Sequence, residues 1–343
     1  MTRKTRYFML TSFAVLVTGL CAGLVAYYGG LPAGLLARQP GPEELAYVPP
    51  DAAVVAYADV QQVMSSELRK RLTQVMPPGE QKGREELKAQ TGIDLERDID
   101  HVVACMIPRD TEGEGHDSGF VAFRGRFDNA RLEALAREHG ATVEDYKGKR
   151  IVRIQPGRHG GDEGDDEHAG KVPASMMLAF AEPGLVMFGD EHAIHGAIDA
   201  RTTGRDVRGN ADMMRLVKDL EATNNAWAVG RFDVLASRAK LPEGVSAQIP
   251  PIRWFAAAGK VNGGMTGLVR VEARDPQAAQ NLRDVLNGLL ALGRMQAGSR
   301  PELQTALQSI TLSGTGSTVE LSFTVPAALV DMLGSAAKKA TDE

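Results

Sequence analysis

The sequence predicts an α+β protein in which an N-terminal transmembrane helix precedes a duplicated unit of largely antiparallel sheet with helices packed on one face. Three observations predict this class. A long uncharged stretch lies near the start, short apolar runs alternate with helical patterns, and the tetrapeptide Gly-Arg-Phe-Asp occurs at residues 125–128 and again at 230–233. Hairpins mixed with helices favour antiparallel sheets over a doubly wound parallel sheet.

The uncharged stretch is 22 residues long and covers residues 7–28, from Tyr7 to Tyr28. A helix of that length measures about 33 Å, which is enough to cross a hydrocarbon core of about 30 Å. Aromatic residues at both ends suit the two membrane interfaces, and the three cations in residues 1–6 favour a cytoplasmic N-terminus. We therefore expect a single-pass anchor in the lipid bilayer of a bacterial inner membrane, with a periplasmic or extracytoplasmic C-terminal domain.

Two alternatives to an anchor remain. A cleaved signal peptide also begins with basic residues, but its apolar region runs about 7 to 15 residues and ends at an Ala-x-Ala-like site. Here the run is longer and no good site of that kind follows it. The other alternative is a buried helix of a soluble protein.

The chain after the anchor divides into four predicted segments. Residues 29–50 are rich in proline and glycine, which oppose regular structure and favour an extended tether. Two α+β units follow at residues 51–205 and 206–335, and residues 336–343 form a flexible tail.

Strands are predicted where short apolar or β-branched runs end at turn residues, and helices where apolar residues recur every three or four positions. Asp59, Asp190 and Asp275 are predicted N-caps. Predicted strands cover residues 52–57, 101–107, 120–126, 150–154, 176–181, 185–188, 226–231, 254–260, 265–273, 309–312 and 319–325. Predicted helices follow residues 59, 81, 127, 190, 211, 232, 275, 300 and 325.

The charge balance limits the partners. The whole chain carries −5, and without the three N-terminal cations 36 basic residues face 44 acidic ones, or −8. An acidic exterior argues against a nucleic-acid partner.

The two cysteines do not predict a disulfide, because Cys21 lies in the apolar stretch while Cys105 lies in a predicted strand, where a buried structural role is expected.

Four strings are distinctive: AYADV at residues 56–60, TGID at 91–94, DHVVAC at 100–105 and NAWAVGRFD at 225–233. They resemble a family of uncharacterised bacterial single-pass membrane-anchored envelope proteins, a domain of unknown function. The resemblance covers most of residues 45–335 and implies an envelope location, but it supplies no activity and no site residue.

The only candidate metal ligands of helical spacing are His192 and His195, which share one helix face at i and i+3. They lack an evident third ligand. The acidic loop at residues 158–170 does not match an EF-hand and is read as a solvated loop, with a weak cation site as the alternative. No cofactor and no catalytic residue are predicted.

Three other motifs are assigned to structure. Residues 116–119 hold His, Asp and Ser, but triad members converge from separate elements. Residues 314–317 contain two glycines but join two predicted strands, so they form a hairpin turn and not a phosphate loop. Trp227 and Trp254 lie in apolar strands and are expected in the core.

We expect a non-enzymatic interaction or binding module of the cell envelope, with a possible envelope protein as its partner. An exported hydrolase or metal-dependent enzyme using His192 and His195 is the first alternative. A carrier of small apolar ligands is the second. The partner hypothesis predicts an exposed apolar patch, since such patches mark interaction surfaces.

Overall fold

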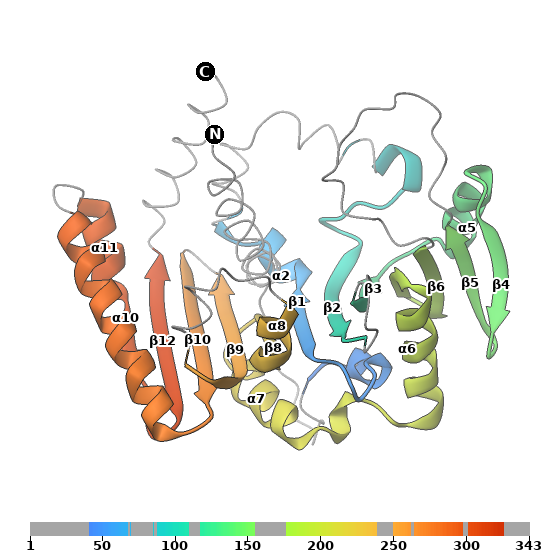
Figure 1. Ribbon diagram of the computed structural model, residues 1–343. Coiled ribbons are helices and arrows are strands. Elements are labelled where there is room, and N and C mark those ends of the chain that lie inside the picture. Colours follow the sequence, from blue (N-terminus) through green and yellow to red (C-terminus); the bar gives the residue numbers. More distant parts are fainter. Residues whose placement is uncertain are drawn as a thin grey trace, which may run out of the picture. The chain divides into compact units, whose positions relative to one another are not determined.

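The computed structural model describes residues 41–67, 69, 85, 88–109, 117–154, 176–238, 250–261, 264–297 and 301–325. The chain folds into two compact units. Unit 1 comprises Met1–Pro42, Ala53–Lys82 and Ala211–Glu343, and unit 2 comprises Glu43–Ala52 and Gly83–Asn210. Within each unit every pair of neighbouring strands is antiparallel, so the predicted α+β class with a largely antiparallel sheet is confirmed (Figure 1).

The described residues of unit 2 form six strands in the order β2-β3-β7-β6-β5-β4. Its strands are β2 (Ile99–Ile107), β3 (Ser118–Gly125), β4 (Thr142–Tyr146), β5 (Lys149–Ile154), β6 (Met176–Glu182) and β7 (Leu185–Asp190). Its helices are η1 (Glu43–Tyr47), α5 (Asn129–Glu138), α6 (Glu191–Thr203) and η2 (Val207–Gly209).

The two faces of this sheet are covered differently. One face packs against α6 and η1, and its side chains are buried, among them Val103, Phe120, Ile151, Met177 and Met187. On the opposite face α5 packs against β5, where Glu133 forms an ion pair with Arg150 at 2.6 Å. The prediction that helices cover one face is therefore wrong for this unit.

Helix α6 begins and ends where its sequence predicts. The carboxylate of Asp190 accepts a hydrogen bond from the Ala193 N–H at 3.2 Å, and Gly204 closes the helix at φ 70°, a left-handed conformation that glycine adopts without strain. Between these caps the apolar residues Ile194 and Ile198 are buried against the sheet. Local capping and an apolar stripe together fix this helix.

In the part of unit 1 that the structure describes, six strands follow the order β11-β12-β10-β9-β8-β1. Its strands are β1 (Val54–Asp59), β8 (Ala226–Arg231), β9 (Ile252–Val261), β10 (Met265–Ala273), β11 (Thr311–Ser313) and β12 (Thr318–Val325). Its helices are α2 (Val60–Met64), α7 (Ala211–Glu221), α8 (Phe232–Arg238), α10 (Pro276–Ala297) and α11 (Pro301–Ser309).

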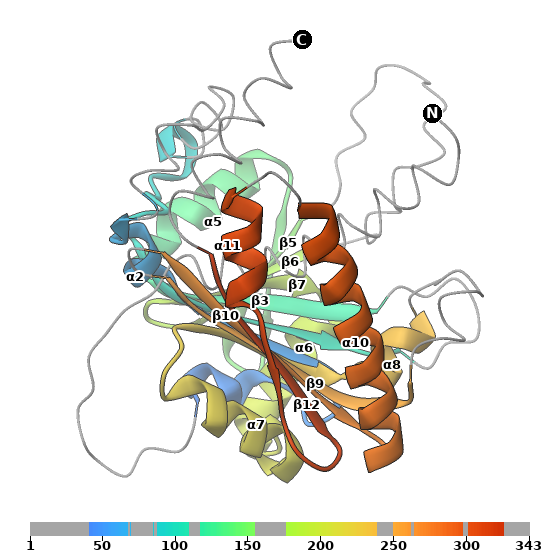
Figure 2. The same cartoon turned by 90° about the vertical axis from the view of Figure 1, so that its left-hand side faces the viewer.

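Helices also lie on both faces of this second sheet. Helix α7 joins one face, where Arg215 bonds Glu272 through two contacts of 2.9 Å. Val271 and Val319 point to the other face and pack with Leu282 and Leu286 of α10. Figure 2 shows α10 and α11 lying across that face. The prediction of helices on one face is wrong here too, because apolar side chains alternate to both sides of the strands.

The repeated Gly-Arg-Phe-Asp sequence makes the same backbone contact in each unit. In unit 2, Arg126 N–H donates to Asp98 O at 2.7 Å, just before β2, and in unit 1, Arg231 N–H donates to Ala53 O at 2.8 Å, just before β1. A Cβ atom on Gly125 or Gly230 would collide with that same carbonyl oxygen. Both glycines therefore stand where a strand approaches the start of its neighbour too closely for a side chain.

Two predicted boundaries need correction. Residues 43–48 were assigned to the tether, yet Leu45, Tyr47 and Val48 are 2% exposed or less. The first predicted unit was to run from residue 51, but β1 pairs with β8 from Val54↔Gly230 to Ala58↔Ala226 and so belongs with the second half of the chain. Contacts with distant parts of the chain thus override chain order in both cases.

Some predictions fall outside the described residues. These are the anchor at residues 7–28, the terminal helix after residue 325 and the tail at 336–343. Across the described ranges, no helix is both long enough and apolar enough to cross a membrane.

Candidate functional site

The candidate site is an apolar surface on the sheet of unit 2, on the side opposite α6. Because side chains alternate along strands, paired residues form rows across β6, β7, β3 and β2. One row is Leu178–Phe188–Val121–Ala104, and the next is Phe180–Val186–Phe123–Val102. We call these eight residues the apolar sheet face.

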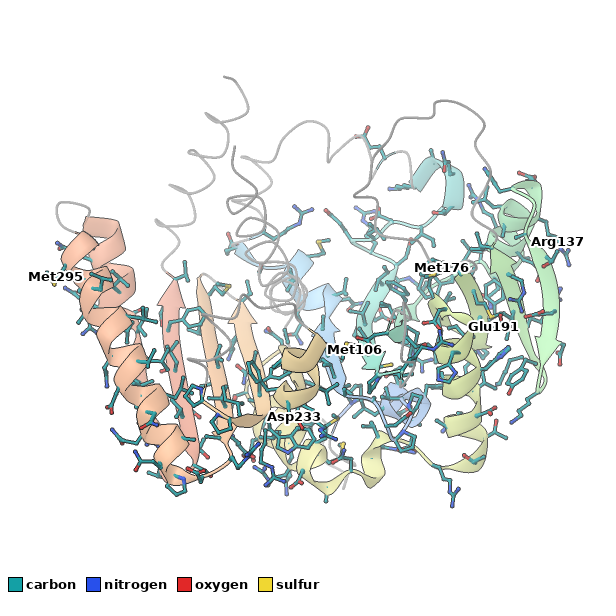
Figure 3. All side chains as sticks on the ribbon, in the orientation of Figure 1. Met106, Arg137, Met176, Glu191, Asp233 and Met295 are labelled. Carbon is teal, nitrogen blue, oxygen red and sulfur yellow. The ribbon has the colours of Figure 1, made fainter. Side chains whose placement is uncertain are left out.

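The apolar sheet face is only partly covered. Val152 of β5, which extends the first row under α5, is fully buried. Phe188 is 37% exposed, and the other members except the buried Val186 are half-buried. Met106 and Met176, labelled in Figure 3, extend this face at one end and are half-buried as well. An apolar surface of this kind is typical of a binding site.

The most buried charged cluster in the described part of unit 2 is centred on Glu44 of η1, whose side chain is 2% exposed. Its Oε1 accepts from Arg124 Nε at 2.6 Å, and its Oε2 lies 3.0 Å from His101 Nε2. Burial alone raises the pKa of this carboxyl, but the hydrogen bond and charge of His101, together with Arg124, lower it to about 2. Glu44 is thus ionised at neutral pH and acts as a fixed anion that holds η1 to the sheet.

Glu182 continues this cluster toward α6. Tyr47 Oη donates to Glu182 Oε1 at 2.8 Å, and Arg201 Nη2 donates to the same oxygen at 3.0 Å. Burial and the neighbouring Glu182 raise the pKa of Tyr47, so its hydroxyl stays protonated. The arrangement ties η1, β6 and α6 together and presents no nucleophile.

The two candidate metal ligands differ in their surroundings. His192 is exposed, while His195 is half-buried with its ring stacked on Tyr146 at 4.0 Å between centroids. Asp199, one turn further along α6, accepts from Tyr146 Oη at 3.0 Å and from Lys147 Nζ at 2.7 Å. Among the described residues, no group of three or more His, Cys, Asp or Glu is placed to hold a metal ion. The structure brings His195 to the β4–β5 hairpin.

Other singled-out residues have structural contacts. Ser118 Oγ donates to Asp190 Oδ1 at 2.6 Å, in support of the cap of α6. Trp227 and Trp254 are buried, as predicted, and burial raises the pKa of the buried Cys105 thiol to about 12. Gly314 and Gly316 form the predicted turn between β11 and β12. His116, Cys21 and the loop at 158–170 lie outside the described residues.

Sequence reasoning did not find the apolar sheet face. It identified the strands at residues 101–107, 120–126, 176–181 and 185–188, but their runs are apolar on both sides. Which face α6 covers depends on the pairing of strands far apart in the chain. The available signal was the excess of apolar residues at alternate positions that a single helix cannot cover.

The comparisons with known proteins supply no family. No protein-family description and no curated protein matches the sequence. One solved structure, described as "Structure of crystal form I of TP0453", aligns with a TM-score of 0.44 and 10% identity. The alignment covers 86% of this chain and 98% of that one. A likeness at this level transfers neither a fold name nor a function.

Proposed function

We propose that the chain is a single-pass protein of the bacterial inner membrane whose extracytoplasmic part is a non-enzymatic binding module for an envelope protein. Residues 7–28 are the anchor, with the N-terminus in the cytoplasm. The apolar sheet face is the surface that binds the partner. The resemblance to uncharacterised membrane-anchored envelope proteins supports the location.

The observation that carries this proposal is the exposure of Phe188 within the apolar sheet face. A phenylalanine 37% exposed at the centre of a row of apolar side chains is unfavourable in water. Covering such a row with a partner removes apolar area from water, and buried aromatic residues contribute strongly to interfaces. The hydrogen-bonded strands β6, β7, β3 and β2 hold these side chains on one face of the sheet.

The module is also proposed to be an internal duplication. The Gly-Arg-Phe-Asp repeat supports this idea, because Arg126 and Arg231 make matching hydrogen bonds to the carbonyl that precedes the neighbouring strand. The two copies differ afterwards. Asp128 caps α5 through Arg131 N–H at 3.0 Å, whereas Asp233 lies in the first turn of α8 and pairs with Arg231 at 2.6 Å.

The proposal assigns the protein no reaction. The most buried carboxylate described, Glu44, is bound to Arg124 and His101, and its pKa of about 2 makes it a poor general acid or base near pH 7. Ser118 is bound to Asp190, with no histidine contact in the described residues. These side chains serve the fold.

The test is covalent crosslinking in intact source cells, followed by capture of the full-length protein and identification of what is attached. A version with residues 7–28 removed but exported by a cleavable signal serves as the comparison. We expect one envelope protein to be recovered with both forms. Recovery of no partner with either form contradicts the proposal, and a partner found only with the anchored form moves the binding surface to the anchor.

A further inference from the structure

Helix α10 of unit 1 has a second apolar face, and the side chains on it are exposed. Its inner face, which includes Ala279, Leu282 and Leu286, contacts the sheet. Four other side chains recur at spacings of four, three and three residues and so share another face of the helix. We call Val285, Leu289, Leu292 and Met295, which are 49%, 59%, 50% and 79% exposed, the α10 stripe.

The α10 stripe is long and uncharged. From residue 285 to 295 it runs about 15 Å along the helix axis. The charged residues of α10 lie elsewhere: Arg283 reaches the β11–β12 turn, where its Nη2 donates to Thr318 O at 2.7 Å, and Asp284 and Arg294 are not part of the stripe. Met295 projects from the outer side of the helix in Figure 3. The helix thus presents an uncharged apolar row at its surface.

The attachment of unit 1 to the chain keeps the whole unit near the proposed anchor. The first described residue, Gly41, donates its N–H to the carboxylate of Glu221 in α7 of the same unit. Twelve residues, 29–40, separate it from the proposed anchor. Fully extended, twelve residues span at most about 43 Å, so unit 1 is held close to the bilayer at a high effective concentration.

We infer that the α10 stripe inserts into the lipid surface of the membrane in which the chain is anchored. The inference rests on the anchor of the proposed function but uses a different surface from the apolar sheet face. A lipid surface accepts a single stripe without a matching shape, whereas a stable dimer buries about 800 Å² on each partner. Four side chains on three turns of one helix supply too little area for a dimer on their own.

The driving force for this insertion is apolar burial. The exported part is acidic and α10 carries two arginines against one aspartate, so attraction to anionic lipid contributes little. Insertion should therefore be the same in phosphatidylcholine vesicles as in vesicles that contain phosphatidylglycerol. Added salt should not weaken insertion, because salt screens charges but does not weaken apolar association.

The test uses full-length protein reconstituted through its anchor into phosphatidylcholine vesicles. A solvent-sensitive fluorescent amino acid is placed at Met295 or, as the matched control, at the exposed Asn287 on the polar side of α10. We expect the probe at 295 to shift to shorter wavelength and to be quenched by spin-labelled phosphatidylcholine, while the probe at 287 does neither. In the variant Leu289→Ser with Leu292→Ser, quenching at 295 should fall about tenfold or more.

Three results overturn the inference. These are equal quenching at both positions, no quenching at either, and quenching at 295 that survives the double substitution. If the fluorescence of the probe at 295 changes only with the amount of protein per vesicle, the stripe binds a second copy of the chain. That result also overturns the inference. Alkaline carbonate extraction of the same vesicles tests the anchor separately. If the protein resists extraction but the probe at 295 is not quenched, the inference about the stripe is refuted and the anchor stands. If the protein is extracted, the anchor of the proposed function is refuted.

Discussion

Glu44 and Arg124 lie 80 positions apart in the chain and meet at 2.6 Å, where a nearly inaccessible carboxylate accepts a hydrogen bond from a guanidinium. This pair, with His101, joins the 3₁₀ helix η1 to strands β2 and β3. The last part of the predicted tether is thus part of the core of unit 2.

Replacing the buried carboxylate should destabilise unit 2. In Glu44→Gln the Arg124 and His101 side chains lose their shared anion, so the free energy of unfolding should fall by about 2 to 3 kcal/mol. Urea unfolding of the protein measures this loss. The neighbouring Glu43 is exposed, so Glu43→Gln is the control and should change stability by less than about 0.5 kcal/mol. Equal effects at both positions would contradict the role of Glu44.

The same carboxylate predicts a pH dependence. Its pKa is about 2 in the folded state against an ordinary value of 4.5, so the unfolded state takes up a proton first as the pH falls. The contribution of Glu44 is therefore fully present above about pH 5 and is lost as the pH falls from there toward 2. Stability measured over this range should fall less steeply in Glu44→Gln than in the wild type or Glu43→Gln.

The repeated glycines should be sensitive to a single methyl group. Gly125→Ala and Gly230→Ala each place a Cβ against the carbonyl oxygen of the neighbouring strand, and each should cost about 2 kcal/mol or more. Gly288 of α10 has open space around it, so Gly288→Ala should stabilise the protein by about 0.5 to 1 kcal/mol. Thermal unfolding separates these outcomes. Tolerance of alanine at one repeated glycine and not at the other would argue against equivalent positions in a duplicated unit.

The Asp190 cap of α6 should contribute more to stability than the surface ion pair of Asp233 with Arg231. Asp190 accepts from Ser118 Oγ, from Gly119 N–H at 2.8 Å and from Ala193 N–H, so Asp190→Ala should cost about 2 to 3 kcal/mol. Asp233 has an exposed partner in Arg231, and Asp233→Ala should cost less than about 1 kcal/mol. Chemical denaturation of both variants checks the order, and a reversed order would exclude this role for Asp190.

Substitutions of the two α6 histidines test metal binding and packing in one experiment. His195→Ala removes the stack on Tyr146 and should cost about 1 kcal/mol, whereas His192→Ala should be close to neutral. A zinc site shared by the two residues would instead make both variants lose a zinc-dependent rise in melting temperature. We expect added zinc to raise the wild-type melting temperature no more than that of either variant.

Local sequence predicted the parts of the fold that depend on neighbours in the chain. Asp190 and Asp275 cap helices as expected, with Asp275 accepting from Ala278 N–H at 2.8 Å. The turn at residues 182–184 joins β6 to β7 as predicted. Each of these features needs only the hydrogen-bonding capacity of a few adjacent residues.

What the sequence did not predict depends on distant partners. Strand β4, TVEDY, was missed because it is a short, polar edge strand with little apolar alternation. Glu44 was placed in a tether because nothing local shows that His101 and Arg124 will bind it. The exposure of Phe188 likewise follows from the order of strands, which pairs it with Val121 and Leu178.

Position-specific photo-crosslinking in living cells tests whether the apolar sheet face binds an envelope protein. A photoreactive phenylalanine analogue is placed at Phe188 of the full-length protein and, in a matched control, at the exposed Thr203 of α6. The account predicts one discrete crosslinked envelope protein from position 188 and none from position 203. The absence of a product at 188, or the same product from both positions, would contradict the assignment of this face as the binding surface.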